Sequence, residues 1–322
     1  MTSHSGAAAH PAKHAGPFRR YLGYTVAVAA VALAAFLLYR TLSQYDWPEL
    51  VSAVTAVSLY HMLLAIGFTA ASYLTLTGFD FLALKYAGHP LAYRRAALAS
   101  FCSLSIGHNI GLAALSSGAI RYRFYSRWGL GAGEVAKVIV FCGVTVGLGL
   151  SILGGVGLLV HPDLAIDVMG IPSSLVTLVA VICLLWPALY LVLAATVERP
   201  LRFRGMTLAM PGFKLALGQV ILGTVNFAFV AGALHQTIAA LADVPYLEVA
   251  AVYVSANVAT LITHVPGGLG VIESVVLYLL PRAELIGAVL VFRFVYFLLP
   301  LALGSLLLGF SEVVLWGRGR RR

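Results

Sequence analysis

The chain has 322 residues, of which 61% are apolar and only 10% are charged. An ordinary soluble domain carries roughly 25% charged residues, so this composition excludes a soluble globular enzyme. Collagen-like, disordered and disulfide-scaffold proteins are excluded with it, and a polytopic membrane protein remains. The formal net charge of +9 is explained by basic loops that face the cytoplasm and anionic lipid headgroups, and no nucleic-acid partner is expected.

Residues 1–20 are small, polar and basic, and they predict a disordered cytoplasmic tail. A single transmembrane domain is expected over 21–317, followed by a basic cytoplasmic tail at 318–322. Apolar segments of about span length lie at 21–38, 57–79, 96–118, 134–160, 173–197, 215–238, 249–280 and 285–316.

Two of these segments are interrupted by residues that break helices. The segment 96–118 contains the run Gly107–Gly111 and then Ser116, Ser117 and Gly118. The segment 249–280 contains the run His264–Gly270, which includes one proline and three glycines. Irregular backbone at membrane depth is tolerated only where protein or a wet cavity surrounds it. Both segments are therefore predicted to be re-entrant hairpins that turn back inside the membrane.

The distribution of basic residues supports this topology. If the other six segments cross fully, the N-terminus, the loops 80–95, 119–137 and 198–214, and the C-terminal tail share the cytoplasmic side. These regions hold 18 of the 21 basic residues, as the positive-inside rule requires. If all eight segments crossed, two basic loops would move to the outside. The sequence thus favours an all-α membrane protein with six full spans and two opposed re-entrant hairpins, and eight full spans are the alternative.

This topology contains an inverted repeat. Residues 18–160 give a span, a span, a hairpin that enters from the inside and a span. Residues 173–317 give the same order with a hairpin that enters from the outside. Inverted repeats with broken helices near the midplane recur among secondary transporters.

The second interruption carries the chemistry of the predicted site. Pro266 lacks an amide donor, and Gly267, Gly268 and Gly270 allow backbone conformations that are closed to other residues. A helix that restarts after them would aim its amides and its positive dipole end into a cavity, where a lipid phosphate could bind. A tight turn without a ligand is the alternative. Glu273 lies one turn into this helix, and it is expected to be protonated, paired or in contact with water.

Other polar side chains accompany the two interruptions. His108 and Asn109 lie in the first and His264 lies in the second, and they are expected to line a cavity and bind freed backbone groups. No metal site is predicted, because no carboxylate-rich cluster surrounds the histidines, and no cofactor is expected. Arg293 lies eight residues into the last span. It either extends outward to the membrane surface or pairs with Glu273.

A basic and aromatic segment follows the first interruption. Arg121, Arg123 and Arg127 alternate with aromatic residues between Gly118 and Trp128. Guanidinium groups bind phosphate while tyrosine and tryptophan lie at the membrane interface, so this segment is a candidate headgroup site. An ordinary positive-inside loop is the alternative.

Two motifs resemble the lysylphosphatidylglycerol synthase transmembrane-region family, the flippase-like module of the multiple peptide resistance factor proteins. The first motif is Ser-Gly-x-x-Arg-x-Arg-x-Tyr at Ser117–Tyr125, and the second is Pro-Gly-Gly-x-Gly-x-x-Glu at Pro266–Glu273. The resemblance implies a bacterial or archaeal inner-membrane protein that moves aminoacylated phosphatidylglycerol or another lipid. It implies as functional residues Arg121, Arg123, Pro266, Gly267, Gly268, Gly270 and Glu273.

The resemblance also contains one departure. The full-length synthases carry a soluble transferase domain after the membrane part, and this sequence shows none after Arg322, so lysyl transfer from tRNA is not expected. No P-loop is present. A lipid flippase or transporter with a phospholipid substrate is the leading prediction, rather than an enzyme. A lipid-modifying enzyme that uses His108, His264 and Glu273, and a scaffold for a lipid synthase, are the alternatives. A homo-oligomer and a lipid-synthase partner are also considered.

Overall fold

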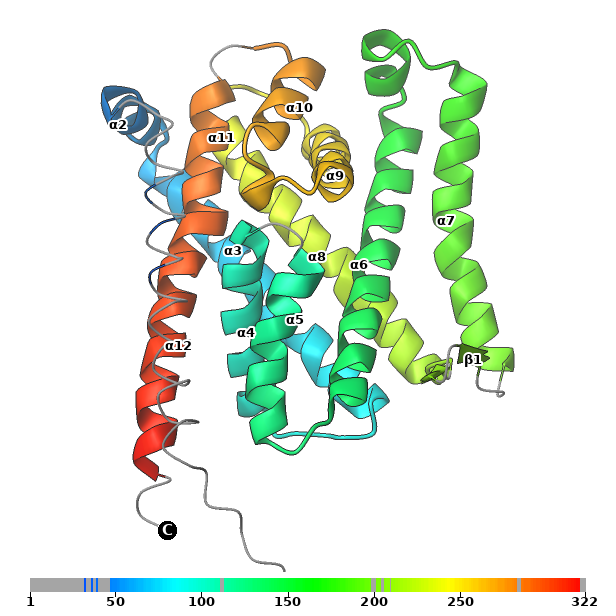
Figure 1. Cartoon of the computed structure of the whole chain (residues 1–322). Helices are drawn as coiled ribbons and strands as arrows, with labels where there is room; N and C mark the ends of the chain where they lie inside the picture. The colour runs from blue at the N-terminus through cyan, green and yellow to red at the C-terminus, as the bar shows by residue number, and fades with distance from the viewer. Residues whose placement is uncertain are drawn as a thin grey trace, which may run out of the picture.

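The computed structural model describes residues 32, 36, 39, 47–110, 113–197, 201–203, 206–208, 210–282 and 285–318. Within these residues, six helices are long and apolar enough to cross a membrane, and the protein is a helical multi-pass membrane protein (Figure 1). The predicted tail 1–20, nearly all of the predicted span 21–38 and the tail after Arg318 lie outside the described residues.

The described helices follow one another with short connections. They are α2 (Trp47–Ala56), α3 (Leu59–Tyr86), α4 (Tyr93–Ile110), α5 (Ala113–Arg127), α6 (Ala132–Val160), α7 (Ser173–Thr196), α8 (Phe213–Ala239), α9 (Tyr246–Thr263), α10 (Val271–Leu279), α11 (Leu285–Arg293) and α12 (Leu299–Arg318). The shorter segments are the π-helical turns η1 (Leu164–Val168) and η3 (Phe294–Leu298), the 3-10 turn η2 (Pro266–Gly268), and the strands β1 (Leu201–Phe203) and β2 (Met206–Leu208).

Five of the predicted spans coincide with candidate spanning helices, namely α3, α6, α7, α8 and the continuous helix of α11, η3 and α12. The sixth candidate helix is α9, which the sequence assigns to a hairpin rather than to a full span. It has 18 residues, so its length and composition alone suffice to cross a membrane.

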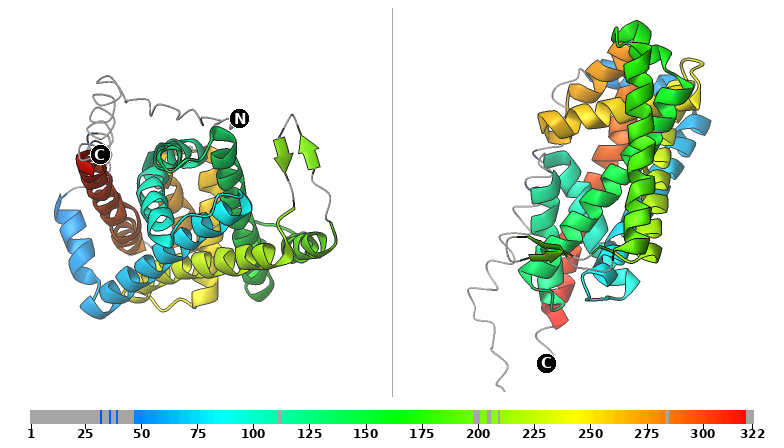
Figure 2. Two further views of the ribbon diagram at one scale, coloured as in Figure 1. Left: turned by 90° about the horizontal axis from the view of Figure 1, so that it is seen from below. Right: turned by 90° about the vertical axis from the view of Figure 1, so that its right-hand side faces the viewer.

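The connection between α7 and α8 differs from the all-α prediction. Strands β1 and β2 pair antiparallel there, with Leu201 opposite Leu208. The two short segments alternate apolar and polar residues, Leu-Arg-Phe and Met-Thr-Leu, which is the period of a strand rather than a helix. This hairpin and α7 lie at one side of the molecule (Figures 1 and 2).

Small residues bring the helices close together. Gly149 of α6 faces Gly223 of α8 so closely that a Cβ added to Gly149 would overlap the backbone of Gly223. Gly304 of α12 approaches Ser105 of α4 with a similar lack of room for a side chain. Such small-residue contacts are the usual means by which helices associate in a membrane, where lipid is as apolar as leucine.

The two interrupted segments fold as helical hairpins. Helices α4 and α5 rise from one end of the molecule, and α9 and α10 lie at the other end, so that the end of α4 faces the second interruption near the middle (Figure 1). We call them the first hairpin (α4–α5) and the second hairpin (α9–α10).

The connections sort by charge as the predicted topology requires. The connections after α3, α5 and α7 lie at the same end as the last described turn of α12 (Figure 1). The connections after α6, α8 and α10 lie at the opposite end, which carries Asp163, Asp167, Asp243 and Glu248. The described parts of these connections lie as the predicted topology requires, and the topology and the side of the membrane on which each group lies stay predictions.

Candidate functional site

The end of α4 in the first hairpin meets the turn of the second hairpin. A Cβ added to Gly267 of the second hairpin would lie 3.9 Å from the Cα of Asn109 in the first, and 3.7 Å from Nη1 of Arg293. The Asn109 side chain donates from Nδ2 to the carbonyl of Ser105, 2.9 Å away, and to the carbonyl of Phe297, 3.3 Å away. The first hairpin is thus joined to the last long helix as well as to the second hairpin.

The turn of the second hairpin depends on left-handed backbone conformations. His264 ends α9 with a φ of 55°, and Gly267, Gly268 and Gly270 have φ values of 61°, 61° and 77°. Residues with a Cβ rarely adopt such values, which explains why glycines fill this segment. Pro266 begins the short η2 turn, where its missing N–H is not needed. The predicted helix break is confirmed.

Arg293 closes this turn through four hydrogen bonds. Its Nε and Nη2 donate to Oε1 and Oε2 of Glu273 over 2.7 and 2.9 Å. Nη1 and Nη2 also donate to the carbonyl groups of Gly267 and Gly268, at 2.7 and 3.1 Å. Pairing with Glu273 is therefore the alternative that the structure adopts. The arginine neutralises the carboxylate and satisfies two carbonyl groups that the helix break sets free.

The first hairpin carries a second buried ion pair, which the sequence analysis did not identify. Arg121 of α5 donates from Nε and Nη2 to the two carboxylate oxygens of Asp80 in α3, at 2.8 and 2.9 Å. Tyr125 donates its hydroxyl to Asp80 at 2.8 Å, and Arg121 also donates to Ser117 at 3.0 Å. The Asp80 side chain is fully buried. Residue 80 falls in the predicted loop 80–95, whereas in the structure α3 continues to Tyr86.

A third ion-pair cluster joins the first hairpin to α12. Arg123 donates from Nε and Nη2 to both carboxylate oxygens of Glu312, over 3.0 and 2.9 Å. Arg127 donates to the same carboxylate at 2.6 Å. Glu312 is buried, whereas the two arginines keep part of their surface exposed. The three arginines predicted to bind a headgroup therefore bind carboxylates of this chain.

Asp80 and Glu312 are the site residues that sequence reasoning missed. Each is an acidic residue inside a helix long and apolar enough to cross a membrane. An ionisable residue in such a helix marks functional sites by default, so this signal was available. Their partners, 41 and 189 residues away in the chain, were not predictable from a single sequence.

The two predicted histidines occupy different surroundings. His108 lies beside Tyr73, with ring centroids 6.4 Å apart, and its buried Nδ1 has no partner in the described structure. His264 is exposed at the end of α9, and its Nδ1 lies 2.9 Å from the carbonyl of Ile262. Among the described residues, no group of three or more His, Cys, Asp or Glu side chains is placed to hold a metal ion.

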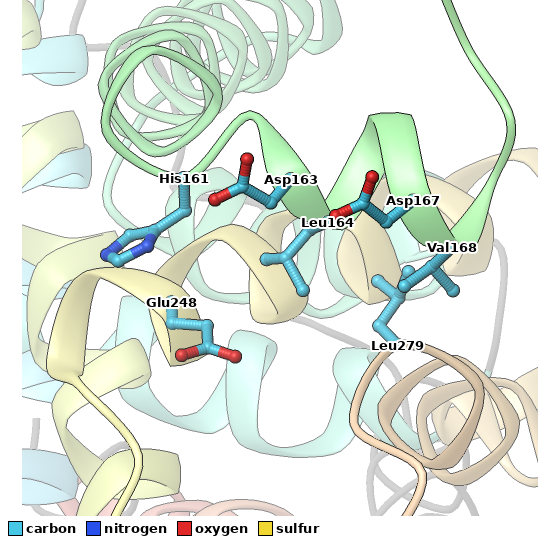
Figure 3. A pocket seen from close by; sticks show the side chains of 7 residues that line it. All are labelled: His161, Asp163, Leu164, Asp167, Val168, Glu248 and Leu279. Carbon is cyan, nitrogen blue, oxygen red and sulfur yellow. The ribbon is translucent and has the colours of Figure 1, made fainter.

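A cavity of about 290 Å³ opens at the acidic end of the molecule (Figure 3). It lies between η1, the first turns of α9 and the end of α10. It is lined by His161, Asp163, Leu164, Asp167, Val168, Glu248 and Leu279. None of the predicted site residues lines it.

Known proteins resemble this chain over most of its length. Residues 27–304 match the family model described as the lysylphosphatidylglycerol synthase TM region. An uncharacterized protein of Synechocystis (slr0712) is 30% identical over 306 residues, which cover 92% of this chain and 95% of that protein. The inner membrane protein YbhN of Escherichia coli is 30% identical over 269 residues, which cover 80% and 82% of the two chains. The chain therefore belongs to the family of the lysylphosphatidylglycerol synthase transmembrane region.

Proposed function

We propose that this protein moves a polar-headgroup lipid, most simply a phospholipid, across the cytoplasmic membrane between its two hairpins. The observation that carries the proposal is the contact of the end of α4 in the first hairpin with the turn of the second, beside the Arg293–Glu273 pair. Polar groups at membrane depth mark substrate pathways. Membership of a family named for a lipid synthase adds support.

The proposed topology has six full spans and two re-entrant hairpins in an inverted repeat, with both termini in the cytoplasm. Support comes from the grouping of basic connections at one end and from the approach of the hairpins from opposite ends (Figure 1). The relative YbhN is named as an inner membrane protein, which suggests the same membrane for this chain.

The arginines of the ion pairs could bind the phosphate of a lipid. Arg123 and Arg127 are partly exposed at the basic end, so a phosphate could share them with Glu312 as it enters. Near the middle, the Glu273 side chain retains 13% of its exposure, and a headgroup could compete there for Arg293. The acyl chains would stay in the surrounding lipid.

The substrate class is defined by this chemistry rather than by a particular lipid. Aminoacylated phosphatidylglycerol is one candidate, because its phosphate suits the arginines and its ammonium group suits Glu273. The energy would come from an ion gradient, from the lipid gradient or from a partner such as a lipid synthase, and a homo-oligomer would be compatible with this scheme.

A lipid-transfer assay tests the proposal. Purified protein is reconstituted into liposomes that contain phospholipids with a fluorescent acyl chain and different headgroups, and dithionite quenches the outer leaflet. We expect quenching beyond one half of the signal, at rates that depend on the headgroup. Protein-free liposomes and the exposed-site variant Asp163→Asn are the controls. Control-level transfer for every headgroup, with and without proton and sodium gradients, would refute the proposal.

A further inference from the structure

The last long helix contacts both hairpins. Segments α11, η3 and α12 form one continuous helix from Leu285 to Arg318, which we call the coupling helix. Arg293, which binds the second hairpin, is the last residue before the π-helical turn η3. Glu312, which binds the first hairpin, lies beyond that turn. A single helix therefore carries one ion-pair partner for each hairpin.

Pro300 explains the irregular turn between these two partners. Proline has no N–H, and its ring clashes with the carbonyl four residues before it, which here is that of Tyr296. The helix responds with the π-helical turn η3, in which the regular hydrogen bonds are displaced. Such turns mark positions where a helix can bend or change register.

Side chains from the first half of the chain bind the carbonyl groups of this turn. Tyr73 of α3 donates its hydroxyl to the carbonyl of Tyr296 at 3.4 Å. Asn109, at the tip of the first hairpin, donates to the carbonyl of Phe297 at 3.3 Å. Helix α3 also carries Asp80, which holds Arg121 of α5. Contacts therefore continue from Arg293 through η3 to both arms of the first hairpin.

We infer that the coupling helix links the two hairpins through η3, so that breaking the ion pair of one hairpin loosens the other. Arg293, which binds the second hairpin, and Phe297, whose carbonyl accepts from Asn109 of the first hairpin, are only four residues apart on this helix. A change in η3 therefore alters both contacts at once. Coupling of this kind is reciprocal, because each site biases the same two arrangements of one element.

The coupling deepens the proposed function, and its role in lipid movement rests on that proposal. A lipid that crosses between the hairpins requires them to loosen in a concerted order. A headgroup that displaces Glu273 from Arg293 would then prepare the first hairpin for movement. The coupling itself is a mechanical property, and it can be measured without any transported lipid.

Hydrogen–deuterium exchange of the protein in nanodiscs tests the coupling. In Arg293→Gln, we expect exchange to be at least about fivefold faster in α10 and also in α5. A fivefold change corresponds to the lower limit of typical coupling energies. In Glu312→Gln, we expect the same in α10 as well as in α5. Helix α7, which lies at the side of the molecule, should exchange at the wild-type rate in both variants.

Two further variants make the result specific. Arg282→Gln removes an exposed positive charge from the connection between α10 and α11, and it should leave the exchange rate of α5 unchanged. Asn109→Ala combined with Tyr73→Phe removes both side-chain hydrogen bonds to the carbonyl groups of η3. Arg293→Gln on this background should no longer accelerate exchange in α5 beyond the double variant itself. If Arg293→Gln does not fold, Glu273→Gln takes its place, because it keeps the two carbonyl contacts of Arg293.

The inference is overturned if each ion-pair variant loosens only its own hairpin, or if removal of both the Asn109 and the Tyr73 contacts with η3 leaves the transmission intact. Coupled exchange in a protein that transfers no lipid would contradict the proposed function and support the inference. Lipid transfer in a protein whose hairpins loosen independently would do the reverse.

Discussion

The first and second hairpins each pair two helices, but they carry charges of opposite sign and have different supports. The arm α5 is basic, and buried carboxylates from two other helices, Asp80 and Glu312, hold it. The arm α10 carries Glu273, and one arginine of the coupling helix holds both this carboxylate and the backbone of the turn. The first hairpin is therefore fixed along its arm, whereas the second is fixed at its turn.

Two of the acidic side chains that take part in these contacts differ in exposure. The Asp80 side chain is 0% exposed and Glu273 is 13% exposed. A charge pair without contact to water needs both partners to remain folded, whereas a partly accessible pair can exchange its partner for a ligand. The exposure therefore predicts a structural role for Asp80, whereas a ligand-responsive role for Glu273 is part of the proposed function. The following substitutions test the structural side of this comparison.

The largest effect is expected from Asp80→Ala. This change leaves the Arg121 guanidinium buried without its carboxylate and deprives the Tyr125 hydroxyl of its acceptor. Breaking a buried pair in this way costs about 3–5 kcal/mol. We expect that loss in the free energy of unfolding, measured in mixed detergent micelles. Asp163→Ala, which removes an exposed carboxylate, should change it by less than about 0.5 kcal/mol.

A double substitution separates the lost pair from a lost packing contact. Asp80→Leu combined with Arg121→Met removes both charges and keeps apolar volume, so most of the stability should return. A double variant no more stable than Asp80→Ala would show that the charges themselves are not the cause, and the structural role of this pair would be rejected.

Arg293→Lys should have the next largest effect. Lysine keeps the charge, but its single ammonium group cannot bind Glu273 through two oxygens and also satisfy the carbonyl groups of Gly267 and Gly268. Unsatisfied buried acceptors cost about 1–3 kcal/mol each, so we expect a loss of about 3 kcal/mol in the same unfolding measurement. Arg121→Lys is the matched change in the first hairpin and should lose less, because its partners are side chains. Equal losses would contradict the distinction between an arm support and a turn support.

The same distinction shows what one sequence can and cannot predict. The break in the second hairpin is predictable from the sequence. The backbone preferences of Pro266, Gly267, Gly268 and Gly270 interrupt a helix locally. The Glu273–Arg293 pair is one of the two alternatives that the sequence leaves open for Arg293, and the structure adopts it. Helix-breaking residues and charges in apolar segments can be recognised in a single sequence.

The supports of the first hairpin depend on contacts that no local pattern encodes. Arg121, Arg123 and Arg127 were expected to face lipid phosphate, and only the folded chain brings Asp80 and Glu312 to them. The π-helical turn was also missed. Its cause, Pro300, is visible in the sequence, but the response of the helix depends on donors from α3 and α4 that tertiary structure provides.

Glycine substitutions in the second turn give a smaller and more local test. Gly268→Ala meets two obstacles, a φ of 61° and a Cβ position 2.9 Å from Oγ1 of Thr260. Gly270→Ala meets only the first, because nothing lies within 4 Å of its added Cβ. We expect a loss of about 2 kcal/mol for Gly268→Ala and about 1 kcal/mol for Gly270→Ala in thermal or chemical unfolding. Adding Thr260→Ala to Gly268→Ala should bring the loss toward that of Gly270→Ala. Unchanged stability in all three variants would mean that this turn is not held in a left-handed conformation.

Arg127→Ala should have the smallest effect and tests whether the two arginines that share Glu312 are equivalent. Arg127 makes one hydrogen bond to this carboxylate and its side chain is 28% exposed, whereas Arg123 makes two and is 18% exposed. Ion pairs with this degree of exposure contribute about 0–1 kcal/mol. We expect less than about 0.5 kcal/mol for Arg127→Ala, and more for Arg123→Ala, because Arg123→Ala removes two of the described hydrogen bonds to the buried Glu312 carboxylate. The reverse order in unfolding measurements at low and high salt would show that Arg127 is the principal support of the first hairpin. Arg123, rather than Arg127, would then be the guanidinium available to a headgroup at the basic end.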